Sequence, residues 1–154
     1  TNKEIAFNNN INLSLITMLK VNTNAVNTFE STNSNTFSIS SDGSITIFDK
    51  RLNLIQKIKN AHDGTIFDIS LKDKNNFATC SGDKSIKTWK KSENKEFLLD
   101  KTILNIHEND IHKIKFLEDD TIISGSKDNK VKILKLVNNE SIACLSFPFT
   151  ALSK

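Results

Sequence analysis

The sequence predicts an all-β protein built from repeated four-stranded antiparallel units. Three stretches, FSISSDGSITIFD, ATCSGDKSIKTWK and ISGSKDNKVKILK, align with one another without a gap. Each places β-branched and aromatic residues at alternating positions between turn residues such as Asp, Asn, Gly and Lys, a pattern typical of strands. No long stretch has a helical period, so helices are not expected.

The three stretches share four columns of chemistry. Each has an acid, a serine two residues before it, another hydroxyl four residues before it and a bulky apolar residue six residues after it. The acids lie 41 and 45 residues apart, a period typical of four-stranded repeats. The columns are Asp42, Asp83 and Asp128; Ser40, Ser81 and Ser126; Ser38, Thr79 and Ser124; and Phe48, Trp89 and Leu134.

Two histidines supply a second, independent spacing. His62 precedes Asp83 by 21 residues, and His107 precedes Asp128 by 21 residues. Each histidine is followed by an acidic residue and then by a strand-like run. The first repeat has no histidine at this place, so its motif is degenerate.

A histidine, then Ser-x-Asp, then tryptophan in a repeat of this length resembles the WD-repeat β-propeller family. The resemblance covers roughly residues 21–147. It departs from the family pattern in three ways: one repeat alone has the tryptophan, Ala61 or Ile106 replaces the usual glycine before the histidine, and the terminal dipeptides read FD, WK and LK. The fold that it implies is an incomplete propeller of about 3.5 four-stranded antiparallel blades.

The resemblance implies that the motif is a structural hydrogen-bond network, since buried polar groups need partners. Thr79 is expected to bridge His62 and Trp89, with Ser81 as the alternative hydroxyl. The full expected set is His62, Thr79, Ser81, Asp83, Trp89, His107, Ser124, Ser126, Asp128, Ser38, Ser40 and Asp42.

A nucleophile triad of His62, Asp83 and Ser81 is the catalytic alternative. Against it, the chain has no GxSxG elbow and only four glycines in all, and the same trio recurs in the next repeat. The recurrence favours a scaffold over an enzyme.

The coarse layout follows from the repeats. Residues 1–20 are expected to form the outer hairpin of a preceding blade, with INLSLITML as its last strand. Blades are expected at 21–60 with the degenerate motif, at 61–106 with the full motif and at 107–147, and residues 148–154 begin a further blade or form a tail.

The middle blade illustrates the expected strands, which lie near 65–71, 76–81, 85–90 and 97–105. Alternation then predicts which apolar residues face the core. They are Ile66, Ile69, Leu71, Ala78, Cys80, Ile86, Ile111, Ile114, Phe116, Ile123, Val131 and Ile133.

The blade count leaves the ring open, because propellers usually have about four to eight blades. One interpretation is that the chain is part of a longer protein. The other is self-association through the open blade edges, with two chains completing one ring.

The resemblance implies protein or peptide partners that bind on the rim of the propeller. The candidate rim residues are Phe67, Thr65, Asp110, His112, Ser41, Gly82 and Lys127. Phe67 is the strongest candidate because aromatic residues often dominate binding energy, although it could instead pack in the core through a bulge. His112 is interpreted as a rim contact, a pH-sensitive group or a half-exposed strand residue.

The predicted function is a non-catalytic protein–protein interaction scaffold or an assembly subunit of a multiprotein complex. The alternatives are an enzyme domain that uses the channel face, and a weak nucleic-acid binder that uses a basic face. Net charge is +3, but lysines alternate with acids and Arg51 is the single arginine, so base reading has weak support.

Neither a metal nor any other cofactor is expected, and no small-molecule substrate. Cys80 and Cys144 have no CxxC spacing, which argues against zinc and favours a reducing compartment. The N-terminus lacks the apolar run of a signal peptide, and no segment reaches the roughly 18 apolar residues of a membrane span. We therefore expect a cytoplasmic or nuclear protein without a membrane partner.

Overall fold

The computed structural model describes residues 5–7, 11–13, 18, 24–118, 120–136 and 145–148. Its regular structure is entirely β within these residues. The strands are β1 (Ile5–Phe7), β2 (Ile11–Leu13), β3 (Val26–Ser31), β4 (Asn35–Ser40), β5 (Ile45–Asp49), β6 (Leu54–Ile58), β7 (Ile66–Leu71), β8 (Asn76–Ser81), β9 (Ile86–Lys91), β10 (Phe97–Ile103), β11 (Ile111–Phe116), β12 (Thr121–Ser126), β13 (Lys130–Lys135) and β14 (Leu145–Pro148).

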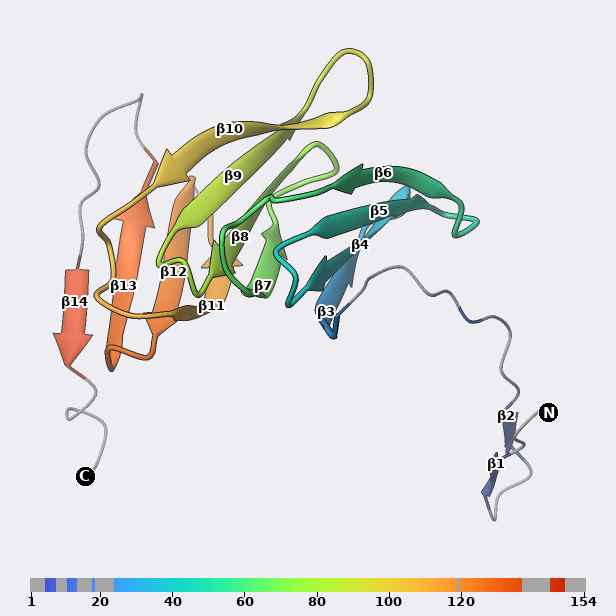
Figure 1. Ribbon diagram of the computed structural model, residues 1–154, viewed down its shortest axis with the longest axis horizontal. Helices are drawn as coiled ribbons and strands as arrows, with labels where there is room; N and C mark the ends of the chain where they lie inside the picture. The colour runs from blue at the N-terminus through green and yellow to red at the C-terminus, as the bar shows by residue number, and fades with distance from the viewer. Residues whose placement is uncertain are drawn as a thin grey trace.

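Three four-stranded sheets follow one another along the chain, each a plain antiparallel meander (Figure 1). We name them blade 1 (β3–β6), blade 2 (β7–β10) and blade 3 (β11–β14). Within each blade, every strand pairs with the next one in sequence in antiparallel fashion. The all-β prediction and the partial-propeller prediction are both confirmed.

The turn between the second and third strands is the same in all three blades. The residue after the acid has a positive φ in each turn: Gly43 at 74°, Lys84 at 65° and Asn129 at 63°. Its N–H donates to the carbonyl of the serine three residues earlier. A left-handed residue closes this tight turn, and glycine and asparagine tolerate that conformation best.

Each first strand carries a β-bulge near its start. The register shifts between Val26 and Thr28, between Ile66 and Asp68, and between Ile111 and Lys113. The extra residues are therefore Asn27, Phe67 and His112, one per blade. A bulge re-aims the side chain that it carries, so these three residues leave the usual inward and outward alternation.

The apolar core lies between the blades. Phe37, Ile39, Ile45 and Ile47 of blade 1 pack against Ile66, Ile69, Phe77 and Trp89 of blade 2. Ala78, Cys80 and Ile86 of blade 2 pack against Ile111, Ile114, Ile122 and Leu134 of blade 3. Blade 2 thus packs on blade 1 with one face and on blade 3 with the opposite face.

The prediction of core residues was right for blade 2 and wrong in part for blade 3. Ile122 and Leu134 are fully buried, whereas Ile123, Val131 and Ile133 are partly exposed. The three residues lie on the face of blade 3 that points away from blade 2, and no described residue buries it. Leu71 and Phe116 are half-buried at the margins of the two clusters.

The two ends of the chain are described only in part, so the layout expected for them is tested only in part. Residues 5–13 contain a hairpin, β1 paired with β2, and its assignment to a preceding blade stays a prediction. The expected last strand of that hairpin runs beyond β2 into residues 14–19, of which only Met18 is described. Residues 149–154 lie outside the described residues.

Candidate functional site

His62 lies at the centre of a buried hydrogen-bond network in blade 2. Its Nδ1 is 2.8 Å from the Asp83 carboxylate, and its Nε2 is 2.8 Å from the hydroxyl of Thr79. The indole N–H of Trp89 donates to the same Thr79 oxygen at 2.9 Å. Because a carboxylate only accepts, Nδ1 carries the proton and Nε2 accepts from Thr79. Thr79, rather than Ser81, is therefore the bridging hydroxyl.

Asp83 is held as a carboxylate by this network. Burial alone would raise its pKa, but hydrogen bonds from His62 and Ser85 outweigh the burial and hold the pKa well below its usual range. The Ser85 hydroxyl donates to Asp83 at 2.6 Å, and the backbone N–H of Ser85 donates at 2.9 Å. The carboxylate thus fastens the turn after β8 to the loop before β7.

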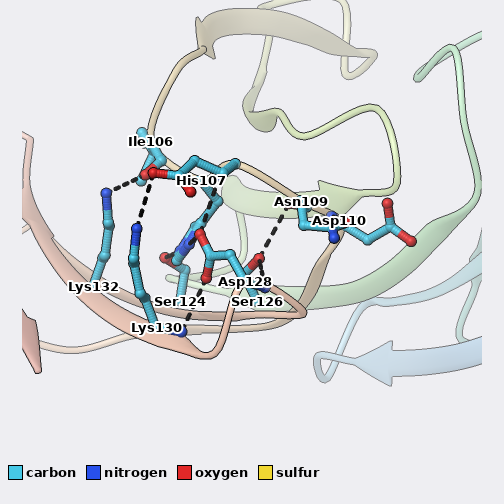
Figure 2. A network of polar contacts seen from close by, with 10 residues as sticks. Ile106, His107, Asn109, Asp110, Ser124, Ser126, Asp128, Lys130 and Lys132 are labelled. Atoms are coloured by element: carbon cyan, nitrogen blue, oxygen red, sulfur yellow. Dashed lines mark hydrogen bonds and ion pairs between the residues drawn. The ribbon is translucent and has the colours of Figure 1, made fainter. Parts of the chain in front are cut away.

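Blade 3 repeats the arrangement, as Figure 2 shows. His107 Nδ1 is 2.9 Å from Asp128, and His107 Nε2 is 2.9 Å from the hydroxyl of Ser124. The tryptophan position holds Leu134, which has no donor, so the chain of hydrogen bonds ends at Ser124. Burial opposes ionisation of Asp128, but bonds from His107 and the backbone of Glu108 and Lys130 lower its pKa to about 2.

Blade 1 departs from the expected network. The Ser38 hydroxyl is buried and has no hydrogen-bond partner among the described residues, so the expectation that Ser38 joins a network is wrong there. Blade 1 has no counterpart of the histidines that bond Thr79 in blade 2 and Ser124 in blade 3. Asp42 keeps its turn role and accepts from the N–H and the hydroxyl of Ser44 at 3.0 and 2.5 Å.

The second serine column has a role of its own. In each turn the N–H of the acid donates to the serine two residues before it, at 3.3, 3.1 and 3.1 Å for Ser40, Ser81 and Ser126. These serines therefore stabilise the turn and do not bond the histidines. The nucleophile-triad alternative fails on this point, since Ser81 is fully buried and the hydroxyls beside His62 belong to Thr79 and Ser85.

Two lysines complete the networks and were missed from the sequence. The ammonium of Lys87 donates to the carbonyl of Ala61 at 2.7 Å, and Lys132 donates to the carbonyl of Ile106 (Figure 2). Each lysine thus holds the residue directly before the network histidine. Their common offset, four residues after the acid, was a usable signal.

The candidate rim residues gather where the first strands begin. Three backbone bonds repeat there: Ser41 N–H to Ala25, Gly82 N–H to Thr65, and Lys127 N–H to Asp110. The Thr65 hydroxyl donates to the Ser41 carbonyl at 3.3 Å across the junction of blades 1 and 2. The seven candidates therefore belong to one repeated structural element.

The bulge residues connect neighbouring blades at this rim. The Asn27 amide donates to the carbonyl of Ile66 in blade 2 at 2.6 Å. The Phe67 ring stacks on the His112 ring of blade 3, with centroids 4.2 Å apart and planes inclined by 13°. Sequence reasoning missed Asn27, because no local pattern marks the position of a bulge.

Gly82 allows this close approach. A Cβ at Gly82 would lie 3.3 Å from the Phe67 ring and 3.8 Å from the Asp110 carboxyl carbon. Asp110 in turn lies 4.0 Å from His112 Nε2. Phe67 is half-buried and His112 is exposed, so an aromatic pair with an acid beside it is presented at the surface.

The described residues contain neither of two arrangements that would suggest other chemistry. No group of three or more His, Cys, Asp or Glu side chains is placed to hold a metal ion there. No helix long and apolar enough to cross a bilayer is found in the same part of the chain.

The three meander sheets and the repeated histidine network define a partial WD-repeat β-propeller. Residues 53–90 and 100–134 match the WD domain, G-beta repeat family. WD40 propellers typically bind protein partners and are typically non-catalytic.

Solved structures with the same fold include the WD40 β-propeller domain of Doa1 and U3-55K. The first is 22% identical over 85% of this chain, with a TM-score of 0.71, and the second is 20% identical over 82%, with a TM-score of 0.70. This chain spans 42% and 41% of those two chains. Comparison with curated proteins gives no match.

Proposed function

We propose that this chain is a non-catalytic interaction scaffold, or an assembly subunit of a multiprotein complex, that binds a protein or peptide at the rim. The observation that carries this proposal is the stack of the half-buried Phe67 ring on the exposed His112 ring, with Asp110 beside His112. Aromatic side chains held rigidly at a surface contribute much of the binding energy in protein interfaces. A stacked pair also loses little entropy on binding, because both rings are already positioned.

The repeated histidine, hydroxyl and acid side chains of the motif are taken up by structure. His62, Thr79 and Asp83 satisfy one another in the interior, and His107, Ser124 and Asp128 do the same. A catalytic site needs a nucleophile or base that a substrate can reach. These observations support a protein that is not an enzyme and that uses neither a cofactor nor a small-molecule substrate.

A cytoplasmic or nuclear location forms part of the proposal. Burial raises the pKa of the Cys80 thiol, and the thiol lies in the core between blades 2 and 3. A buried free thiol fits a reducing compartment.

Quantitative affinity purification tests the rim. The tagged wild-type chain is compared with Phe67→Ala and with Lys74→Glu, a control in the exposed turn between β7 and β8. Proteins that bind the wild type saturably should be lost with Phe67→Ala and kept with Lys74→Glu. Equal recovery with all three chains would contradict the rim as the binding site, and binding to RNA that weakens steeply with salt would favour the nucleic-acid alternative.

A further inference from the structure

Neighbouring blades meet at the rim through one repeated arrangement. Thr65, the residue before β7, donates from its hydroxyl to the carbonyl of Ser41 in the preceding blade at 3.3 Å. One blade further on, Asp110 precedes β11 in the place of Thr65, and Gly82 stands in the place of Ser41. The Asp110 side chain also lies against the preceding blade, since its carboxyl carbon would be 3.8 Å from a Cβ at Gly82. The junction of blades 2 and 3 thus has a carboxylate where the junction of blades 1 and 2 has a hydroxyl.

The carboxylate cannot make the bond that the hydroxyl makes, because it only accepts hydrogen bonds. Two acceptors, the Asp110 carboxylate and the Gly82 carbonyl, therefore lie at one junction, and no described residue donates a hydrogen bond to either of them. His112 Nε2 is 4.0 Å from Asp110 Oδ2, too far for a hydrogen bond. Lys127 is exposed, and in the described part of the chain it forms no ion pair with Asp110. This junction lacks a donor.

The two acceptors are within reach of a partner. Figure 2 shows the Asp110 carboxylate directed away from the buried network of His107, and the Asp110 side chain is 31% exposed. Gly82 has no side chain to occupy the junction, and the half-buried Phe67 ring lies beside it, 3.3 Å from the position of a Cβ. We call Phe67, Gly82 and Asp110 the notch. They come from β7, the turn after β8 and the residue before β11, all of which are described, so the notch does not depend on what packs on the far face of blade 3.

A group that satisfies the notch has to be a cation with several donors. A guanidinium has five N–H donors in one plane and pairs with carboxylates through two parallel bonds. Its remaining N–H groups are free to reach a carbonyl, and the aliphatic stem of arginine packs well on apolar surface such as the Phe67 ring. An ammonium is a more strongly hydrated point charge without this planar geometry. Arginine therefore fits the notch better than lysine.

We propose that the notch binds an arginine side chain of the partner that the rim recruits. The guanidinium donates to the Asp110 carboxylate and to the Gly82 carbonyl, and the stem of the arginine packs against Phe67. This inference rests on the proposed rim function and adds the chemistry of the partner, a protein segment that presents an arginine.

An NMR titration with matched peptides tests the notch. The ¹⁵N-labelled chain is titrated with a short peptide of Gly, Ser and Ala around one arginine, and control peptides carry citrulline or lysine at that position. Citrulline keeps the size of arginine and loses the charge. The amide signals of Gly82 and Asp110 should shift, and the arginine peptide should bind roughly tenfold more tightly than the citrulline peptide, the effect of one charge-assisted pair. Equal affinity for these two peptides, or tighter binding of the lysine peptide, would overturn the proposal.

Two variants separate a role in binding from a role in folding. Asp110→Asn should weaken the arginine peptide roughly tenfold, whereas Asp63→Asn, the same change at an exposed carboxylate before β7, should leave its affinity unchanged. Asp110→Thr restores the residue found at the junction of blades 1 and 2. This variant should be at least as stable as the wild type in urea denaturation, because the new hydroxyl can donate to Gly82, and it should lose the arginine peptide. Unchanged peptide affinity in both Asp110 variants, or equal weakening by Asp63→Asn, would refute the notch.

The rim proposal and the notch proposal can fail separately. Partners that are lost with Phe67→Ala but recovered equally with Asp110→Thr would refute the arginine and leave the rim. Partners that are recovered equally with Phe67→Ala, together with an arginine-peptide affinity that depends on Asp110, would refute the rim as the partner site and leave the notch as an arginine-binding site.

Discussion

The Phe67 ring lies parallel to the His112 ring across the junction of blades 2 and 3, with centroids 4.2 Å apart. Each residue is the bulged residue of its own first strand. Two bulges at equivalent positions thus bring together side chains 45 residues apart in sequence. The contact serves both the blade junction and the surface at which we expect a partner.

The stack should contribute a measurable coupling energy. A double-mutant cycle with Phe67→Ala and His112→Ala is expected to give a coupling of about 0.5–1.5 kcal/mol in the free energy of unfolding, the usual range for aromatic pairs. Urea denaturation of the four chains measures it. Strict additivity of the two single changes would show that the rings make no energetic contact.

Trp89 should be a main determinant of the stability of blade 2. The side chain is buried and donates to Thr79, so Trp89→Ala is expected to lower the free energy of unfolding by about 3–5 kcal/mol. Trp89→Phe keeps most of the packing and loses the donor, and it should cost less. Chemical denaturation followed by circular dichroism measures both, and an unaffected Trp89→Ala chain would refute the structural role of the motif.

The two network carboxylates, Asp83 and Asp128, should make the fold sensitive to acid. The pKa of Asp128 is lowered from 3.8 to about 2, so the folded chain binds this proton more weakly than the unfolded chain does. The stabilisation is therefore fully present above the ordinary pKa and is lost as pH falls from about 4 to 2. Asp83, with its pKa also lowered, acts in the same direction.

A comparison of wild type with Asp128→Asn isolates the contribution of the Asp128 carboxylate to the pH dependence of stability. The difference in their free energies of unfolding should be largest near neutral pH and should shrink below pH of about 4. Asp63→Asn, a change at an exposed carboxylate next to His62, serves as the control. A difference for Asp128→Asn that stays constant from neutral to acid pH would contradict the assigned role.

Lys132 should stabilise blade 3 through the loop before His107. Its ammonium donates to the carbonyl of Ile106, and loss of such a charge-assisted bond costs about 1.5–3 kcal/mol. Lys132→Met keeps the aliphatic stem and removes the donor. Lys135→Met on the same strand is exposed and should have little effect on urea denaturation. Equal stability of the two variants would show that the Lys132 bond contributes nothing.

The sequence alone was enough for the repeat, the strands and the two networks. The hydroxyls and the bulky residue lie within six residues of Asp83 and Asp128, and each histidine lies 21 residues before its acid. Because buried polar groups need partners, a histidine, a carboxylate and a hydroxyl at these spacings are expected to bond one another. The same reasoning put Thr79 first and left Ser81 as the alternative, because alternation places both on the face of Trp89. The hydrogen bonds from His62 and Trp89 decided for Thr79. These features depend on fixed spacings that the two histidine-containing repeats carry in the sequence itself.

Only the tertiary structure decided what depends on a neighbouring blade. The bulge that turns Phe67 toward His112, the orphaned hydroxyl of Ser38 and the partial exposure of Ile123 cannot be read from strand alternation. Alternation says which residues share a face, but burial of that face depends on whether another sheet packs on it. For blade 2 a sheet does, whereas no described residue packs on the equivalent face of blade 3.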